Sequence, residues 1–546
     1  MKAGGVNMIS GAKIMIECLE AEGVKTIFGY PGAAICPFYD ALIDSSICHI
    51  LVRQEQNAGH AASGYARISG RPGVCVVTSG PGATNLVTAI ASAYMDSIPI
   101  VAITGQVQSE LIGRDVFQEA DITGACEPFT KHSYLVKRTE DLPRIFKEAF
   151  YIASTGRPGP VLIDVPVDIQ TKEIKSYKYP ETVDIIGYKP SLKGNGLQIK
   201  RACEAIVSSK RPVICAGGGV FSSKAEHVLM EFARKADIPV VNTLMGIGVL
   251  PSEERLCLGM LGTHGVKMAN EAIQHADLLL LCGARVGDRS MASPNQVAKR
   301  TKIIHIDVDP AEIGKNMQAN IPIVGDLKSV LEQMLERIDN LEHSEWIEKC
   351  REHKQQLCKA ETEGEYIDPK RFMRLLSEKV DDNAVLVADV GQNQIWSANC
   401  FNVKNGRFLT SGGMGTMGYS VPASVGAWTA APDRQVIAVC GDGSFQMQMM
   451  ELGTIKQHSI KSKIIVMNNT KLGMVRELQD KNYGGRHSGV DLYGSPDFNL
   501  LAQAYGIPHC RISDMSEVAG AIDKMLSTDG PFLMECIVNP AESSLI

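Results

Sequence analysis

The sequence predicts an α/β protein made of doubly wound domains with parallel sheets. Short apolar, β-branched runs recur along the 546 residues, and glycine-rich turns and segments with helical spacing follow them. At about 150 residues per domain, the chain is long enough for three or four hydrophobic cores. A linker rich in Lys, Tyr and Pro at 170–192 and a charged helical connector at 340–365 separate the runs. We therefore expect three domains, over residues 1–180, 190–345 and 366–546.

Composition and charge argue against several classes of function. A charged fraction of 21% and a net charge of −6 give no reason to expect nucleic acid or an anionic membrane as a partner. No apolar run approaches the roughly 18 residues of a membrane span, and the N-terminus lacks the apolar core of a signal peptide. The 15 cysteines include no CxxC pair, and several lie in apolar runs as small hydrophobic residues. The sequence thus predicts a cytoplasmic protein.

The first domain is expected to begin with a helix that Ser10 caps and Gly23 ends. A strand at 26–29 then leads into a turn at 30–34, where Gly32 brings the backbone close to whatever lies at the strand end. An ordinary loop between a strand and a helix is the alternative interpretation of this turn.

A second strand is expected at 50–53, followed by a helix at 58–67 whose small residues allow close packing. Glu55 lies at the junction, where a glutamate is usually solvated. From 73 to 107 the pattern alternates strand, glycine-rich turn, helix and strand, which completes one doubly wound domain.

The second domain repeats the pattern, with apolar runs at 212–216, 238–244, 277–286 and 302–309. The three glycines at 217–219 follow the first run and could cradle a dinucleotide. Asp307, at the end of the last run, could bind a ribose hydroxyl. For both features, plain turn chemistry between a strand and a helix is the alternative.

The third domain contains the most informative stretch. An apolar run at 436–440 stops at Gly441-Asp442-Gly443, and Ser444 opens a segment with helical spacing. A second run at 464–467 ends at Asn468-Asn469, so 24 residues (444–467) separate the two polar turns. Because parallel neighbouring strands end at the same edge of a sheet, these turns should lie close together.

The residues of the two turns suit a metal ion and a diphosphate. Asp442 offers a carboxylate and Asn469 a carbonyl oxygen, which are hard ligands of the kind that Mg²⁺ prefers. Gly441 and Gly443 allow backbone amides to approach a phosphate, and the positive end of the helix at Ser444 favours the anion. The alternative is a plain loop of glycine and aspartate.

This spacing resembles the thiamin diphosphate (ThDP) signature of the ThDP-dependent carboligases and decarboxylases. The resemblance implies that Asp442, Asn469 and the backbone carbonyl of Lys471 hold Mg²⁺. It also implies that Glu55 hydrogen-bonds N1′ of the aminopyrimidine ring, a task that requires a shielded carboxyl with a raised pKa.

The segments TSGPGATN, AYMDSIP, ITGQV, DVFQE and KHS further resemble the large catalytic subunits of the acetohydroxyacid (acetolactate) synthases, and the likeness extends over residues 8–540. It implies a pyrimidine-binding N-terminal domain, an FAD-binding central domain and a diphosphate-binding C-terminal domain. Phe117 and Gln118 would line the pocket, and Gly32 and Ala33 would face the reacting centre. For Phe117, core packing is the alternative.

The same resemblance implies two sets of cofactor-binding residues. The ThDP set is Val390, Gly391, Gln392, Asn393, Gly415, Met417, Gly441, Gly443, Ser444 and Met474. The set for a non-redox FAD is Arg157, Gly218, Thr243, Leu244, Met260, His264, Gly283, Arg285, Asp307 and Asp326. The chain departs from the family pattern at Asn393 (usually His), at Val286-Gly287 (usually Phe-Asp), at Val167 (commonly Lys) and at Leu478 (usually Trp).

The resemblance implies a synthase that decarboxylates pyruvate and joins it to pyruvate or 2-ketobutyrate in the biosynthesis of valine and isoleucine. It implies a homodimer or a dimer of dimers, because Glu55 of one chain must meet the metal site of another, and it raises the question of a small regulatory subunit. Leu478 would bear on the choice of acceptor, unless it lies on a mobile loop outside the pocket. The competing functions are another ThDP reaction, such as pyruvate oxidation or a different carboligation, and a non-catalytic ThDP-binding paralogue.

Overall fold

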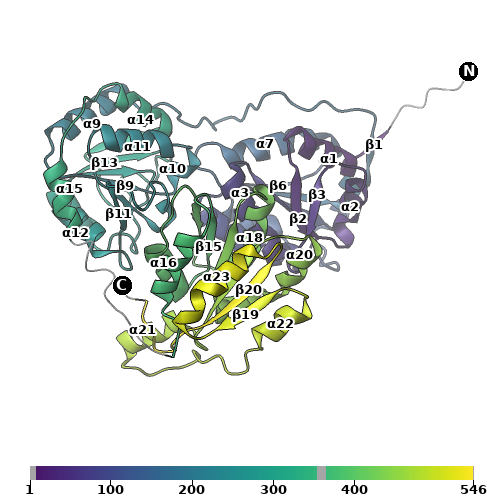
Figure 1. The fold of residues 1–546 in the computed structure, drawn as a ribbon. Helices are drawn as coiled ribbons and strands as arrows, with labels where there is room; N and C mark the ends of the chain where they lie inside the picture. The colour runs from purple at the N-terminus through teal and green to yellow at the C-terminus, as the bar shows by residue number, and fades with distance from the viewer. Residues whose placement is uncertain (1–7, 353–364, 545–546) are drawn as a thin grey trace, which may run out of the picture.

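Three α/β domains make up the protein in the computed structural model, which describes residues 8–352 and 365–544 (Figure 1). Each domain is built on a six-stranded parallel sheet with helices on its faces, which confirms the predicted fold class. The first two domains lie side by side in Figure 1, and the C-terminal domain, green to yellow, lies below both. In the described ranges, no helix combines the length and the apolar character that crossing a membrane requires.

The N-terminal domain contains one parallel sheet and a short antiparallel pair. Its strands are β1 (Ile9–Ser10), β2 (Thr26–Tyr30), β3 (Cys48–Leu51), β4 (Gly73–Val77), β5 (Ile100–Gln106), β6 (His132–Leu135), β7 (Val161–Pro166) and β8 (Glu173–Ile174). Its helices are α1 (Gly11–Ala21), α2 (Cys36–Leu42), α3 (Glu55–Ser69), α4 (Pro81–Asn85), α5 (Val87–Met95), α6 (Ile122–Cys126), α7 (Leu142–Ser154) and α8 (Val167–Thr171). The sheet order is β3-β2-β4-β5-β7-β6, so the winding reverses between β2 and β4.

The central domain has the sheet order of a dinucleotide-binding fold. Its strands are β9 (Pro212–Ala216), β10 (Val240–Asn242), β11 (Cys257–Met260), β12 (Leu278–Cys282), β13 (Lys302–Asp307) and β14 (Ile321–Val324). Its helices are α9 (Gly196–Ser208), α10 (Gly219–Ser222), α11 (Glu226–Lys235), α12 (Lys267–His275), α13 (Pro294–Arg300), α14 (Leu327–Leu335) and α15 (Ser344–Arg351). The order β11-β10-β9-β12-β13-β14 reverses between β9 and β12.

The C-terminal domain repeats the winding of the first. Its strands are β15 (Val385–Ala388), β16 (Arg407–Leu409), β17 (Val436–Gly441), β18 (Lys463–Asn468), β19 (His509–Ile512) and β20 (Phe532–Ile537). Its helices are α16 (Pro369–Lys379), α17 (Gln392–Cys400), α18 (Ser420–Ala430), α19 (Asp442–Gln448), α20 (Leu452–Gln457), α21 (Gly473–Tyr483), α22 (Phe498–Ala504) and α23 (Val518–Ser527). The order β16-β15-β17-β18-β20-β19 reverses between β15 and β17.

Several local predictions are confirmed, and others are displaced by a few residues. The Ser10 hydroxyl caps α1 by accepting the N–H of Lys13 (3.3 Å). The second strand, expected at 50–53, is β3 at Cys48–Leu51, because its register against β2 pairs Cys48 with Thr26. The helix expected at 58–67 begins at Glu55, and the one expected from Ser444 begins two residues earlier. The part of the 340–365 connector at 353–364 lies outside the described residues.

Helices α3 and α18 pack against each other between the N-terminal and C-terminal domains. A Cβ atom added to Gly64 would lie 2.0 Å from the carbonyl oxygen of Ala423, and one added to Gly426 would lie 1.8 Å from that of Ala61. The small residues are therefore required for the helices to touch. Ala61 precedes Gly64 in α3, whereas its partner Gly426 follows Ala423 in α18, so the two helices run antiparallel.

The buried imidazole of His60 in this interface should make the fold sensitive to acid. It is fully buried beside Tyr419, and burial lowers its pKa to about 3. In the unfolded chain the pKa is near 6.5, so below pH 6.5 the unfolded state binds a proton that the folded state does not. Stability is therefore lost as the pH falls from 6.5 towards 3, by about 2 kcal/mol at pH 5.

A non-ionising variant, His60→Gln, measures this contribution. We expect the thermal midpoint of the parent to fall between pH 7.5 and 5 by a few °C more than that of the variant. Equal pH dependence of the two proteins would show that His60 does not resist protonation in the fold.

Candidate active site

Two turns at one edge of the C-terminal sheet bring Asp442 and Asn469 together. β17 and β18 are parallel neighbours, with Gly441 opposite Met467, so the residues that follow them lie side by side. The turn at 389–393 follows β15 at the same edge, where the strand order reverses. Doubly wound sheets bind their ligands in this crevice.

Asp442 is a buried acidic residue of this edge, only 1% exposed. Burial raises the pKa of its carboxyl to about 7. Its Oδ2 atom has no hydrogen-bond partner among the described residues. A buried carboxylate oxygen that lacks a donor fits a bound cation, which would supply the missing positive charge.

The potential ligand atoms at this edge come from one carboxylate and from an amide group. Within 8–352 and 365–544, no group of three or more His, Cys, Asp and Glu side chains is arranged to hold a metal. The Asp442 carboxylate and the amide oxygen of Asn469 are hard oxygen ligands, the type that suits Mg²⁺.

A chain of hydrogen bonds orients Asn469. Its Nδ2 donates to Oε1 of Gln392 (2.9 Å), and its Oδ1 accepts the N–H of Lys471 (3.1 Å). Nε2 of Gln392 donates in turn to Oε1 of Glu477 (2.7 Å) and to the carbonyl oxygen of Glu542 (2.7 Å). Gln392 thus connects Asn469 both to helix α21 and to the C-terminal segment.

Glycines line the turns that the sequence assigned to a diphosphate. Gly391 has φ +133°, and a Cβ added to it would lie 3.0 Å from Oδ1 of Asn393. The N–H of Gly441 donates to Oγ of Ser444 (3.2 Å), which closes the start of α19. The backbone at this edge is therefore open to a ligand that a side chain would exclude.

Asp389, which the sequence interpretation did not single out, fastens these turns together. Its buried carboxylate accepts the N–H groups of Val390 (2.9 Å), Gly418 (2.9 Å) and Ser420 (2.8 Å). The sequence did contain a signal for this role, because Asp389 is an acidic residue at a strand end, directly before the expected diphosphate turn.

Asp96 was also missed, although it lies in the AYMDSIP segment. Its carboxylate accepts the N–H of Gly412 (3.0 Å) and of Gly413 (2.7 Å), so the N-terminal domain holds a loop of the C-terminal domain. That loop continues to Gly415, at φ +67°, and to Met417. Asp96 therefore contributes to placing two residues that were expected to bind ThDP.

Helix α21 carries two more of the expected residues. Met474 is half-buried in its first turn, and Leu478 follows one turn later with 46% of its surface exposed. Because Leu478 lies inside a helix, the alternative that it belongs to a loop is wrong.

The N-terminal domain assembles a second group of expected residues around Glu55. Glu55 is the first residue of α3 and is half-buried, and its Oε2 accepts Nδ2 of Asn85 (2.9 Å). A Cβ added to Gly82 would lie 3.4 Å from Oε1 of Glu55. A Cβ added to Gly32 would overlap the side chain of Thr78 at 2.5 Å, so this turn requires glycine.

The loop that carries Phe117 lies beside this group. Phe117 is 87% exposed, so the alternative that it packs in the core is wrong. Gln118 has φ +60°, and its carbonyl oxygen lies 2.9 Å from the position of a Cβ on Gly80. Ala33 begins a short 3₁₀ helix at Ala33–Ile35. An exposed aromatic side chain on a loop is available for contact with a ligand or a second chain.

Within one chain, Glu55 and the sheet edge that carries Asp442 lie at opposite ends of α3. At the C-terminal end of α3, Arg67 donates to the carbonyl oxygen of Thr410 (2.7 Å), directly after β16 and therefore at the edge that carries Asp442. Glu55 begins the other end. The 15 residues of α3, at about 1.5 Å per residue, separate the two ends by about 20 Å.

The central domain places polar groups at the carboxyl edge of its sheet. Asp307 ends β13, and burial raises the pKa of its carboxyl to about 6. Arg157, from the N-terminal domain, forms ion pairs with Glu312 (2.8 Å) and Asp309 (3.3 Å). Burial lowers the pKa of the Arg285 guanidinium. Other expected residues lie at the same edge. Gly218 follows β9, Thr243 and Leu244 follow β10, and Met260 ends β11, shortly before His264.

Two of the expected features have structural roles of their own. Added Cβ atoms on Gly217 and Gly219 would lie 2.3 Å and 2.7 Å from backbone atoms of Gly283, so these glycines allow one turn to pack on another. Asp326 caps helix α14 by accepting an N–H of its first turn (3.0 Å). These contacts give the three glycines and Asp326 structural roles in their turns.

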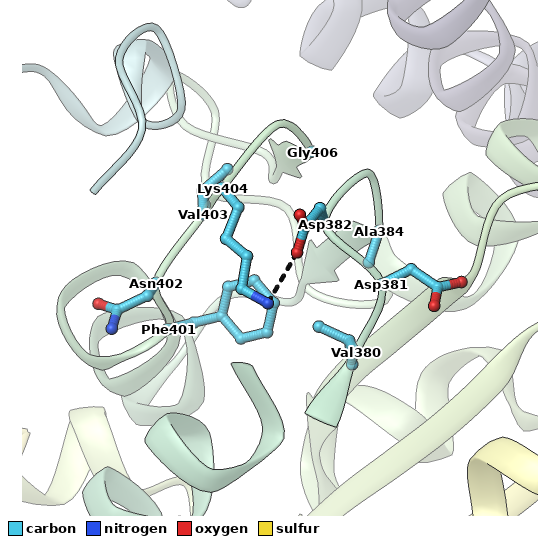
Figure 2. A pocket seen from close by; sticks show the side chains of 9 residues that line it. All are labelled: Val380, Asp381, Asp382, Ala384, Phe401, Asn402, Val403, Lys404 and Gly406. Carbon is cyan, nitrogen blue, oxygen red and sulfur yellow. Dashed lines mark ion pairs between the residues drawn. The ribbon is translucent and has the colours of Figure 1, made fainter. Parts of the chain in front are cut away.

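A separate surface pocket lies away from both groups (Figure 2). Its lining consists of Val380, Asp381, Asp382 and Ala384, which precede β15, and of Phe401, Asn402, Val403, Lys404 and Gly406, which precede β16. An ion pair between Lys404 and Asp382 (2.9 Å) crosses it. Because it lies at the amino edge of the C-terminal sheet, it is not part of the edge that carries Asp442 and Asn469.

Comparison with known proteins extends over nearly the whole chain. Residues 9–125, 199–334 and 389–536 match the N-terminal thiamine pyrophosphate (TPP) binding domain, the central domain and the C-terminal TPP binding domain of thiamine pyrophosphate enzymes. The probable acetolactate synthase large subunit of Methanocaldococcus jannaschii is 48% identical over 98% of this chain and 93% of its own length. The acetolactate synthase large subunit of Lactococcus lactis is 43% identical over 98% of this chain and 94% of its own length. The acetolactate synthase isozyme 3 large subunit of Escherichia coli is 42% identical over 95% of this chain and 93% of its own length.

The matches agree with the edge at which Asp442 and Asn469 meet, since residues 389–536 include the turns that carry Asp389, Asp442 and Asn469. Identity above 40% along the full length is far beyond what a shared fold alone requires. The chain is a member of the acetolactate synthase large-subunit family of thiamin diphosphate enzymes.

Proposed function

We propose that this chain catalyses the synthesis of 2-acetolactate, in which pyruvate is decarboxylated and joined to a second 2-keto acid. With 2-ketobutyrate as the second acid, the product is 2-aceto-2-hydroxybutyrate. The observation that carries the proposal is the buried, unpartnered oxygen of Asp442 beside Asn469, in a chain that belongs to this enzyme family. The reaction serves the biosynthesis of the branched-chain amino acids valine and isoleucine.

The proposal assigns ThDP and Mg²⁺ to the edge of the C-terminal sheet. Asp442, Asn469 and the carbonyl of Lys471 would hold the metal, since together they offer hard oxygen ligands with one charge. The glycine turns and the N-terminus of α19 would receive the diphosphate through backbone N–H groups. When bound, ThDP supplies a nucleophilic carbon and an electron sink for decarboxylation of the keto acid.

The residues of this chain provide position and proton transfer. Gly415 would offer its carbonyl to the 4′-amino group, and Met417 would support the bent form of the cofactor. Glu55 would exchange a proton with N1′ of the pyrimidine ring. Phe117 and Gln118, on the exposed loop, would line the side from which the keto acids enter.

We infer that a working site requires two copies of the chain, as a homodimer or a dimer of dimers. The separation of about 20 Å along α3 prevents Glu55 from reaching the metal-binding edge of its own chain. Glu55 is also only half-buried in the single chain, whereas its task requires a shielded carboxyl. A second copy that covers Glu55 with its own metal-binding edge would meet both requirements.

A non-redox FAD in the central domain is also proposed. The strand order and the buried carboxyl of Asp307 at a strand end support a dinucleotide there. Arg285 places a positive charge at the same edge, and this charge would favour the binding of an anionic ligand. Arg157 already has two acidic partners and Asp326 caps a helix, so these two carry less of the argument.

Two further proposals concern the setting of the enzyme. The relatives are named large subunits, so we infer a small regulatory subunit as a partner. No disulfide joins the cysteines of the described ranges, which supports a cytoplasmic location.

Product analysis tests the proposed function. The full chain is incubated with pyruvate alone and with 2-ketobutyrate, with and without ThDP, Mg²⁺ and FAD. Acetolactate, detected as acetoin after acid treatment, is the expected product and should require ThDP and Mg²⁺. Peroxide or acetyl phosphate would instead support a pyruvate oxidase, and ThDP binding without turnover would support a non-catalytic paralogue.

Leu478 should weaken the preference for 2-ketobutyrate as acceptor. A leucine packs less completely on the extra methyl group than the tryptophan usual in the family, and one methylene is worth at most about 10- to 200-fold in discrimination. We expect Leu478→Trp to raise the ratio of acetohydroxybutyrate to acetolactate in a competition between both keto acids. Leu500→Trp, on the exposed face of α22, is the matched control. An unchanged ratio with intact activity would place Leu478 outside acceptor selection.

A further inference from the structure

A buried carboxylate, Glu451, lies between the N-terminal and C-terminal domains. It ends a 3₁₀ helix at Met449–Glu451 and has no solvent exposure. Its Oε1 accepts the N–H of Arg53 (2.8 Å) and Nδ2 of Asn57 (2.7 Å), while its Oε2 accepts the hydroxyl of Thr454 (2.5 Å). Burying a carboxylate is costly, and the three hydrogen-bond donors offset this cost, so Glu451 makes a specific contact between the domains.

The two donors from the N-terminal domain stand on either side of Glu55. Arg53 precedes it and Asn57 follows it in the first turn of α3. The strand before this turn is held by the same segment of the C-terminal domain, because the N–H of Leu51 donates to Nε2 of His458 (3.0 Å). The turn that carries Glu55 is therefore fixed by the other domain of its own chain.

We propose that Glu451 is a positioning residue for Glu55. It acts through the backbone of Arg53 and the side chain of Asn57, which set where the first residue of α3 points. The inference rests on the proposed function, in which Glu55 exchanges a proton with the bound cofactor. A displacement on the order of 1 Å at such a group costs about 10²-fold in rate.

The length of the Glu451 side chain, and not its charge, should matter. Glutamine reaches equally far and keeps an oxygen for Arg53 and Asn57, and the hydroxyl of Thr454 can instead donate to the carbonyl oxygen of Leu51, 3.2 Å away. Aspartate keeps the charge but is one methylene shorter, so it cannot hold both donors and Thr454. The two variants thus separate geometry from ionisation.

The test uses the full-length protein with ThDP and Mg²⁺ bound and no keto acid present. The exchange of the C2 proton of ThDP with deuterated solvent reports the work of Glu55 directly, and amide exchange over residues 51–57 reports the order of the turn. We expect Glu451→Asp to slow C2 exchange by about 10²-fold and to speed amide exchange. Glu451→Gln should stay within a few-fold of the parent in both measurements.

Ser63→Ala is the matched control. It removes a buried hydrogen bond between the same two domains, to the Tyr419 hydroxyl (2.9 Å), farther along α3. We expect a loss of thermal stability without slower C2 exchange. His458→Ala keeps the inference testable if the aspartate variant does not fold, since it releases only the N–H of Leu51 and should also slow C2 exchange.

Three results would overturn the inference. They are normal C2 exchange in Glu451→Asp, normal C2 exchange in His458→Ala, or a glutamine variant as slow as the aspartate one, which would mean that charge is needed. Because C2 exchange needs no keto acid, a parent enzyme that exchanges C2 but forms no acetolactate would reject the proposed function alone.

Discussion

Replacing Glu55 by glutamine is expected to reduce acetolactate formation by about 10²- to 10⁴-fold, the usual contribution of general acid-base catalysis. Glutamine keeps the shape of the side chain and its hydrogen bond with Asn85, because one amide oxygen remains. It loses the ability to take up and return a proton at N1′. The affinity for ThDP and the thermal midpoint should therefore stay close to those of the parent.

Steady-state kinetics with pyruvate, together with ThDP titration by calorimetry, checks this expectation. Glu226→Gln is the matched control, because Glu226 is also a half-buried glutamate at the start of a helix, α11. It should leave turnover unchanged. Near-normal turnover in Glu55→Gln would remove Glu55 from the mechanism, even if the enzyme makes acetolactate.

Replacing Asp442 by alanine should abolish the Mg²⁺-dependent retention of ThDP. The metal loses its charged protein ligand, and the loss of one partner of a buried charge pair costs about 2–5 kcal/mol, or roughly 30-fold and more in affinity. The protein without cofactor should not suffer, because Asp442 is a buried carboxyl with an oxygen that lacks a donor. Its thermal midpoint should be equal to or above that of the parent.

Thermal melts with and without ThDP and Mg²⁺ read out both effects. The parent should be stabilised by the cofactors, whereas Asp442→Ala should not be. Asp433→Ala is the control, because Asp433 is an exposed aspartate just before the other end of the same strand, β17. If Asp442→Ala retains ThDP as tightly as the parent, the metal is not held at this edge.

The sequence by itself determined the fold class and brought Asp442 and Asn469 to one edge of a sheet. Apolar runs, glycine turns and helical spacing are encoded within about 20 neighbouring residues, so they can be interpreted without tertiary contacts. The two polar turns separated by one helix necessarily share an edge once their strands are parallel neighbours, and Gly441 does lie opposite Met467. The same local logic explains why Ser10 was recognised as a helix cap.

Only the tertiary structure decided which distant groups support that edge and the turn that carries Glu55. Strand β3 lies two residues earlier than its apolar pattern suggested, because its pairing with β2 outweighs the local preference. Asp96 and Glu451 bond to partners hundreds of residues away, and such contacts leave no periodic signal. The separation of Glu55 from Asp442 likewise follows from the antiparallel packing of α3 on α18, which depends on glycines in both helices at once. Local sequence encodes the elements and their ends, whereas the direction in which two helices cross is a property of the packed surfaces.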